Sequence, residues 1–491
     1  MVSDRQSILF SSADTYKTLS RAVRRGEAVR LGTGVYSTDT TSPPEILVRR
    51  EWRTIAGGAF PHATITDRSA PNAGPVDGVL YLVHDAPARS LVLPGLTISA
   101  RRGAPPQSDD VALPGGLHQA SFARGLVENA IPSRARTTGV ARRLSRAELG
   151  DWIDRAARFS SASELGRVRD RVRSLAPLLG VTAQAARAVD DLIGAALGTR
   201  DAPKGSRALH QRSIGLPYDT QRVERFDLLI DALRSAAPQN RPAAPLSPST
   251  LPFYEAYFSN YIEGTEFTVE EAEAIIYEGR VPEGRPADAH DVQATYELVS
   301  DLEEMHRTAA DLTEFIDLLT HRHASFMAGR PEKRPGLFKE LPNRAGSTLF
   351  VHPDLVRGTL LEGFARLDEL DSAWERAVYV HYLVAAVHPF DDGNGRLARI
   401  MMNSELDRRG QSRLIIPSVY RDDYLGALRR LDRADDPSVL VDALRYAHDW
   451  TASIDFTDAA TVREQLEVTH AFAPADGSER LTLPLTRHFL R

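Results

Sequence analysis

Apolar residues recur at helical spacing through the second half of the chain. Beyond residue 250 this pattern predicts helices at 254–262, 268–278, 292–308, 312–328, 354–367, 373–387, 396–409, 422–432 and 437–454. Thr268 and Glu271 have the spacing of a capping box at the start of the second helix. Strand patterns are few, and they lie at 337–341 with 348–351, and near 469–472 and 481–483. We therefore predict a C-terminal all-α domain with an inserted β-hairpin.

The first part of the chain has a mixed pattern. A helix is predicted at 12–25 with Asp14 as its N-cap, and strands at 28–31 and 35–37 flank a glycine-containing turn. A helix at 45–56, strands at 79–83 and 90–101, and a helix entered through 117–124 follow. A basic helix followed by a small hairpin is the outline of a winged helix-turn-helix, and the alternative is a solvated helix beside an unrelated hairpin. The N-terminal part is predicted to be α+β.

Proline-rich segments suggest where the domains meet. The segments 102–116 and 236–252 combine proline with glycine or serine, and the second is the better linker. We therefore divide the chain near residue 250. The predicted parts are a winged helix-turn-helix at 1–40, an α+β region at 41–140, a helical connector with its linker at 141–250, a catalytic domain at 251–455 and a C-terminal extension with short strands at 456–491.

The amino-acid composition indicates a globular protein and excludes cysteine-based chemistry. The chain has 491 residues, of which 42% are hydrophobic and 26% charged, as in ordinary globular proteins with several domains. It has no cysteine, which excludes disulfides, thiolate metal sites and cysteine nucleophiles. Neither a signal peptide nor a long apolar run is visible, so we expect a cytoplasmic protein without a membrane partner.

Charge is distributed unevenly. Residues 1–200 hold 27 Arg and Lys against 19 Asp and Glu, whereas the rest holds 33 against 47. A basic N-terminal part is typical of a protein that binds a polyanion such as DNA, although an arginine-rich genome gives the same excess. In a winged helix the DNA-contacting side chains would be Lys17, Arg21, Arg24, Arg25 and Arg30.

The segment 19–36, LSRAVRRGEAVRLGTGVY, resembles the N-terminal winged helix of the AbiEi-type antitoxin and regulator family, and the rhythm of elements to about residue 200 is similar. The resemblance implies DNA binding.

The segment 388–399, HPFDDGNGRLAR, gathers the groups that phosphate chemistry needs. Glycines around Asn394 at a helix start let backbone N–H groups approach an anion, and Asp392 offers the hard oxygen that Mg2+ prefers. Arg396 and Arg399 are three residues apart, so they share a helix face that can grip a polyphosphate. His388 is the one neutral-pH base in the segment. Each feature alone is more often structural.

Together these twelve residues match every position of the Fic motif, and the resemblance extends over about 250–455. It implies AMP transfer from ATP to a Ser, Thr or Tyr hydroxyl of a target protein. By the same resemblance the segment 340–351 is a flap that docks the target, with Glu340, Asn343, Gly346 and Thr348 as its candidate contacts. Carried over position by position, His388 would deprotonate the hydroxyl, Asp392 would hold Mg2+, Gly393, Asn394 and Gly395 would bind phosphate, Arg396 would neutralise it and Arg399 would bind the γ-phosphate.

A second motif lies upstream, at 259–264. Ser259 and Glu263 are four residues apart on one helix face, and Gly264 is a natural helix C-cap. Beside a complete Fic motif this segment resembles the family's inhibitory signature on a helix at 254–264. The resemblance implies that Glu263 pairs with Arg399 and hinders productive ATP binding.

Two other functions remain open from the sequence. One is a DNA-binding regulator or antitoxin-like protein that uses the Fic domain as a nucleotide sensor. The other keeps the fold and changes the reaction to UMP transfer or to removal of AMP. The target protein, the DNA site and the oligomeric state do not follow from the sequence.

Overall fold

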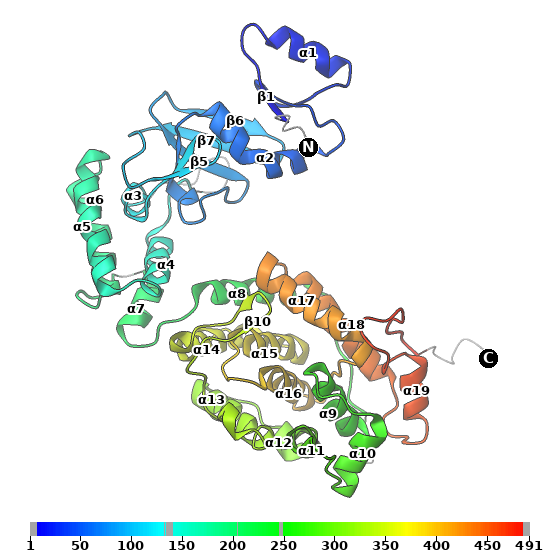
Figure 1. Cartoon of the computed structure of the whole chain (residues 1–491). Coiled ribbons are helices and arrows are strands. Elements are labelled where there is room, and N and C mark those ends of the chain that lie inside the picture. The colour runs from blue at the N-terminus through cyan, green and yellow to red at the C-terminus, as the bar shows by residue number, and fades with distance from the viewer. Residues whose placement is uncertain (1–6, 132, 134–140, 204, 245–248, 485–491) are drawn as a thin grey trace. The chain divides into compact units, whose positions relative to one another are not determined.

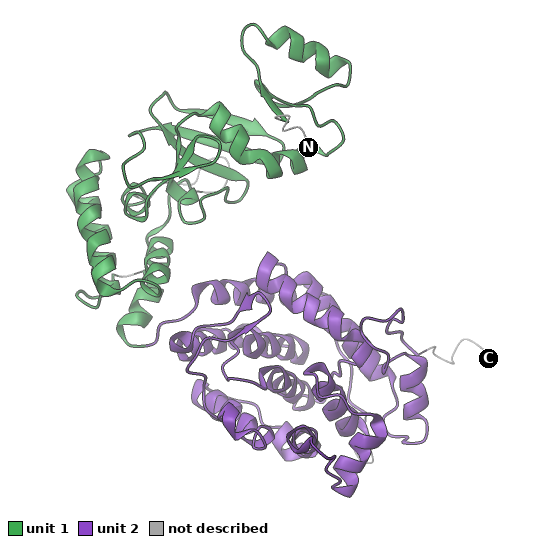
Figure 2. Cartoon of the chain, viewed as in Figure 1, with its two compact units in different colours: residues 1–215 green, residues 216–491 purple. Residues whose placement is uncertain are grey.

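A computed structural model of the chain describes residues 7–131, 133, 141–203, 205–244 and 249–484. The chain forms two compact units, Met1–Gly215 and Leu216–Arg491 (Figure 1, Figure 2). This division lies upstream of the boundary predicted near residue 250. Helix α8 (Thr220–Ser235) contacts α14 (Val356–Phe364), α15 (Ala373–Val387) and α18 (Ser438–Ser453) of the second unit. Ser412 N–H donates to Arg241 O at 2.7 Å. The segment read as a connector is thus partly built into the C-terminal unit.

The N-terminal end of the first unit is a small sheet with one helix. Strands β1 (Ile8–Phe10), β2 (Val29–Gly32) and β3 (Val35–Ser37) pair antiparallel in the order β1-β3-β2, and α1 (Tyr16–Arg24) joins β1 to β2. The predicted hairpin is present. The helix begins later than predicted because Ser12 and Thr15 exchange hydrogen bonds in a turn ahead of it. A winged helix-turn-helix stays a prediction.

A six-stranded mixed sheet forms the middle of this unit. Its strand order is β6-β7-β5-β4-β9-β8, with β5 parallel to β7 and β4 parallel to β9. Helix α2 (Pro44–Ala59) packs on it through Leu47, Val48 and Ile55, all buried. The α+β prediction is confirmed here. The remaining elements are β4 (Thr64–Ile65), β5 (Val79–His84), β6 (Arg89–Leu93), β7 (Leu96–Arg102), β8 (Val111–Leu113), β9 (Leu117–Gln119) and α3 (Phe122–Glu128).

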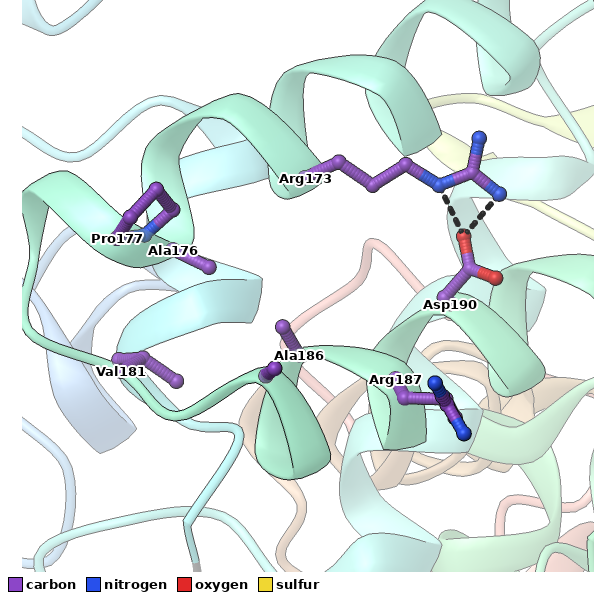
Figure 3. Close-up of a pocket in the computed structure, with 8 residues that line it drawn as sticks. Arg173, Ala176, Pro177, Val181, Ala186, Arg187 and Asp190 are labelled. Atoms are coloured by element: carbon purple, nitrogen blue, oxygen red, sulfur yellow. Dashed lines mark hydrogen bonds and ion pairs between the residues drawn. The ribbon is translucent and has the colours of Figure 1, made fainter.

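Within residues 141–203 and 205–215, the helices of the first unit are α4 (Arg146–Ala157), α5 (Ala162–Leu178), α6 (Ala183–Ala196) and α7 (Arg207–Ser213). Capping boxes start α4 at Ser145 and α5 at Ser161. A cavity of about 360 Å³ lies between α5 and α6. Figure 3 shows Arg173 and Asp190 paired across it. Arg173 Nη2 lies 2.8 Å from Asp190 Oδ1. Alanine, proline and valine form most of the remaining wall.

The second unit is helical, as predicted. The hairpin β10 (Arg344–Ala345) and β11 (Thr348–Leu349) is shorter than expected, and 337–341 is not a strand, because Lys339 N–H bonds to Pro389 O at 2.9 Å instead of a neighbouring strand. Besides α8, its α-helices in the described ranges are α9 (Leu251–Ile262), α10 (Val269–Glu278), α11 (Pro286–Ser300), α12 (Leu302–Met305), α13 (Leu312–Phe326), α14 (Val356–Phe364), α15 (Ala373–Val387), α16 (Asn394–Asp407), α17 (Arg421–Ala434), α18 (Ser438–Ser453) and α19 (Val462–Val468).

The C-terminal extension differs from the prediction. Residues 456–484 contain α19 and no strand, because Thr469 caps that helix and His470 turns the chain at a φ of 62°. Leu466 and Leu481 pack into the aromatic core around α9. None of the helices within the described ranges has the length and apolar character needed to span a bilayer.

Helices α15 and α16 form the centre of the second unit. Of their residues, 11 of 15 in α15 and 13 of 14 in α16 are buried. The segment between them, 388–393, therefore has little freedom, since both of its ends are fixed in the core.

Candidate active site

His388 ends helix α15 in a left-handed conformation, with a φ of 52°. Its Nδ1 lies 3.2 Å from Ala385 O, and because a carbonyl only accepts, Nδ1 carries the proton and Nε2 keeps its lone pair. The imidazole stacks on the Phe350 ring at 3.6 Å between centroids. Burial, and next the charge of Lys339, lower the pKa of His388 to about 4. The ring is thus a neutral, oriented base.

The loop after His388 is held by side chains that turn back onto its backbone. Phe390 N–H donates to Asn394 Oδ1 and Asn394 Nδ2 donates to Phe390 O, both at 2.9 Å. The Phe390 ring is buried and stacks on His323 at 3.8 Å. His323 accepts from Gly336 N–H and donates to Asp392 O, so this histidine is a structural link. Gly393, at a φ of 72°, then starts α16.

Asp392 is the candidate metal ligand. Its Oδ1 accepts the Gly393 N–H at 2.7 Å, and the side chain is 45% exposed. Across the described residues no three His, Cys, Asp or Glu side chains gather as a metal site. A single exposed carboxylate nonetheless fits Mg2+, which takes one or two carboxylates and completes its shell with phosphates and water. Asp392 would hold the ion, which would supply charge neutralisation to the phosphates.

A cavity of about 300 Å³ joins the base to the start of α16. His388, Gly395 and Arg399 all line it, with an apolar wall that includes Leu425 and Leu428. Backbone N–H groups at the N-terminus of α16 give this end of the cavity a positive potential.

Glu263 occupies this positive end. The residue caps α9, and its Oε1 lies 2.7 Å from Arg399 Nη2. A Cβ added to Gly395 would meet that oxygen at 2.2 Å, so only glycine lets the carboxylate approach. Burial disfavours the charge of Arg399, but Glu263 and Tyr424 together outweigh this effect and raise the pKa of Arg399. Ser259 fixes the same guanidinium through its carbonyl at 2.9 Å and its hydroxyl at 3.0 Å.

Residues 286–406 match the model of the Fic/DOC family. This part of the chain is a Fic/DOC family domain. The protein adenylyltransferases Fic of Drosophila persimilis and Drosophila melanogaster are each 26% identical over 249 residues, which is 48% of this chain and 47% or 49% of theirs. The chain thus spans about half the length of these relatives. A structure of Fic-1 from C. elegans is 19% identical, with a TM-score of 0.36 over 61% of this chain and 89% of that one.

Within the Fic/DOC domain, Arg396 faces away from the cavity. Its Nη1 lies 2.8 Å from Asp291 Oδ2 and 3.2 Å from Asn260 Oδ1, and the residue is 3% exposed. Arg330 pairs with the same Asp291 oxygen at 2.8 Å. The cavity wall includes Arg399 but not Arg396. The predicted phosphate contact of Arg396 therefore has no geometric support in this conformation, in which the side chain belongs to a buried ion network.

The four predicted flap residues of the Fic/DOC domain differ in whether they are free to contact a target. Gly346 makes the hairpin turn at a φ of 58°, and Glu340 is exposed and pairs with Arg334 at 2.7 Å. Asn343 instead turns inward, where its Nδ2 donates to Phe390 O at 2.9 Å. Thr348 is buried and accepts from Arg433. Two of the four candidate docking side chains thus support the hairpin.

Three groups around the base were not predicted from the sequence. Phe350 stacks on His388, buried Lys339 reaches Val387 O, and Tyr424 OH lies 2.7 Å from His381 Nε2 behind Arg399. Of the three, only Phe350 lies in a segment to which the sequence assigns a role, the predicted flap. The other two lie outside any motif.

The candidate DNA contacts lie on and after α1. Lys17, Arg21 and Arg24 are exposed on one face of the helix, which buries none of its residues. Arg25 pairs with Glu27 at 2.8 Å, and Arg30 Nε donates to Gly32 O at 3.3 Å. The helix therefore presents three of the five predicted cations together.

Proposed function

We propose that the protein is an adenylyltransferase that moves AMP from ATP to a Ser, Thr or Tyr hydroxyl of a target protein. One observation carries the proposal: the base His388 and the N-terminus of α16 line the same cavity. A hydroxyl placed there would meet the free Nε2, while a phosphate would meet the backbone N–H groups. The names of the Drosophila relatives support this reaction.

In the proposed reaction the hydroxyl oxygen attacks the α-phosphorus of ATP. The bond from that phosphorus to the bridging oxygen breaks, pyrophosphate leaves, and the hydroxyl proton passes to Nε2 of His388. The Nδ1 bond to Ala385 O keeps the ring oriented through this proton transfer. Arg399 would bind the γ-phosphate and balance the charge of the departing group.

The enzyme is proposed to be autoinhibited. Glu263 pairs with the guanidinium of Arg399, which is proposed to bind the γ-phosphate, and lies against Gly395. Its carboxylate would therefore occupy the position of that phosphate. Two anions compete for one cation, and the anion that belongs to the chain is always present. ATP would then bind with its phosphates displaced from the in-line geometry that transfer needs.

The experiment incubates the Glu263→Gly chain with each of four labelled nucleoside triphosphates and Mg2+, and measures label on protein. Label from ATP alone supports AMP transfer, whereas label from UTP indicates UMP transfer. Nucleotide binding without label indicates a sensor. In a second incubation, an AMP-modified protein is mixed with the wild-type or the Glu263→Gly chain. Loss of AMP with the wild-type chain alone indicates that Glu263 takes part in the removal of AMP. The last three results overturn the proposed reaction.

A second function, DNA binding by the first unit, is favoured by the exposed face of Lys17, Arg21 and Arg24 on α1. Removing these three charges together should weaken binding of the full chain to labelled duplex DNA and reduce its salt dependence. A control that removes Arg146, Arg167 and Arg187, also exposed, changes the net charge equally. Equal effects of both triple variants, or no binding at low salt, would contradict this function.

A further inference from the structure

Lys339 is a buried cation outside any motif. It is 3% exposed, and its ammonium Nζ donates to Asn343 Oδ1 at 2.7 Å and to Val387 O at 3.4 Å. Among the described residues, no carboxylate makes an ion pair with it. Burying a charge among neutral acceptors costs free energy that an apolar side chain would avoid. Packing alone therefore does not explain a lysine here.

The contacts of Lys339 join two segments that are distant in sequence. Its backbone N–H donates to Pro389 O at 2.9 Å, and its ammonium bridges the flap residue Asn343 and the end of α15. Asn343 in turn donates to Phe390 O at 2.9 Å and accepts Phe350 N–H at 3.2 Å. The Phe350 ring then covers the imidazole of His388. These contacts join the flap to His388 in two ways, through the backbone of the loop after His388 and through the ring of Phe350.

We propose that Lys339 is a positioning residue that fastens the flap to the loop of His388, so that a target docked on the hairpin and the base that meets its hydroxyl keep one fixed relation. The inference rests on the proposed function, because only transfer to a docked hydroxyl needs this relation. The ammonium does not line the cavity and therefore acts through Asn343 and the backbone of the loop.

The charges around Lys339 and His388 agree with this role. Burial, and next Arg222, lower the pKa of Lys339 to about 7, while Asp391 acts in the opposite direction. Lys339 in turn lowers the pKa of His388, against smaller opposing effects of Glu263 and Asp392. The charged form of Lys339 thus favours the neutral form of the base. Loss of that charge should let His388 take up a proton at higher pH.

The test compares the wild-type chain with Lys339→Met and Lys339→Arg by hydrogen exchange of backbone amides. In Lys339→Met, exchange should rise about tenfold or more in both 339–350 and 387–393, as expected for loss of a hydrogen bond from a charged group. Peptides of α10 should not change, and Lys339→Arg should recover part of the protection. Unchanged exchange, or a rise confined to the hairpin, overturns the proposal.

A second variant covers the case in which Lys339→Met loosens the whole unit. Asn343→Ala removes the same ammonium contact and leaves the cation in place, so it should raise exchange in the same two segments. Protection retained there overturns the proposal.

Titration of His388 by NMR, with histidine-labelled chain and His388→Gln for assignment, gives a readout that needs no activity. The midpoint should move to higher pH in Lys339→Met, and an unmoved midpoint counts against the coupling. In a Glu263→Gly background, Lys339→Met should lower kcat with little change in the KM for ATP. If Glu263→Gly alone transfers nothing, the proposed function fails, while exchange and titration still decide the role of Lys339.

Discussion

The Oε1 atom of Glu263 lies 2.7 Å from Nη2 of Arg399, at the helix start where Gly395 leaves room for it. Glu263 belongs to the end of α9 and Arg399 to the middle turns of α16, 136 residues apart. Their pairing places an internal anion in the cavity that His388 also lines. In the proposed mechanism, inhibition and transfer therefore depend on the same guanidinium.

Ser259→Ala should relieve the inhibition only in part. The variant removes the hydroxyl that accepts from Arg399 Nε at 3.0 Å, but the Ser259 carbonyl and Glu263 still hold the guanidinium. A lost neutral acceptor is worth about 1 kcal/mol, or roughly fivefold. Labelled-ATP transfer should therefore rise by a small factor above wild type, and Ser259→Thr should match wild type. A rise as large as that of Glu263→Gly would show that Ser259 is the main restraint.

His388→Ala should abolish transfer and leave ATP binding nearly intact. The side chain is the proposed base and hydrogen-bonds to Ala385 O, and loss of a general base typically costs about 10² to 10⁴ in rate. Calorimetry with ATP and labelling in a Glu263→Gly background measure the two effects separately. Transfer at an unchanged rate would remove His388 from the mechanism.

The rate should stay high at mildly acidic pH. Burial lowers the pKa of His388 to about 4, so the ring remains neutral, and able to accept a proton, well below the ordinary histidine value of about 6.5. Single-turnover transfer by Glu263→Gly, measured between pH 5 and 8, should show no loss centred near 6.5. A loss centred at 6.5 would mean that the base titrates as an exposed histidine.

Arg396→Met should destabilise the second unit more than it weakens ATP binding. The change leaves Asp291 buried with one of its two arginine partners removed, and breaking a buried pair costs about 3 to 5 kcal/mol. Urea denaturation followed by circular dichroism measures the loss, and adding Asp291→Asn should recover part of it. Unchanged stability with a large loss of ATP affinity would return Arg396 to the phosphate site.

Features formed by residues close together in the sequence could be predicted from it. The spacing of Thr268 and Glu271 predicts a capping box that the structure contains, and the glycines after Asp392 predict a tight approach that Gly393 and Gly395 show. These features depend on residues within one turn of each other. Local spacing is visible in a sequence without any knowledge of the fold.

The sequence failed where a partner comes from elsewhere in the fold. Arg396 and Arg399 share a helix face, and both are predicted to bind phosphate, yet Arg396 pairs with Asp291 of α11. The pair of Arg399 with Glu263 that the resemblance implies is present. Alternation at 337–341 predicts a strand, but the loop of His388 provides the hydrogen-bond acceptor. Such choices are made by tertiary packing, which single-sequence patterns do not contain.

The proposal that Glu263 restrains a competent transferase is tested most directly by comparing wild type with Glu263→Gly. Both are incubated with ATP labelled at the α-phosphate and Mg2+, and protein-bound label is measured over time, with Glu263→Gly/His388→Ala as control. If Glu263 is the restraint, label should be at least about tenfold above wild type in the single variant, as for loss of one charge-assisted pair, and absent in the double variant. Equal labelling of wild type and Glu263→Gly would contradict it.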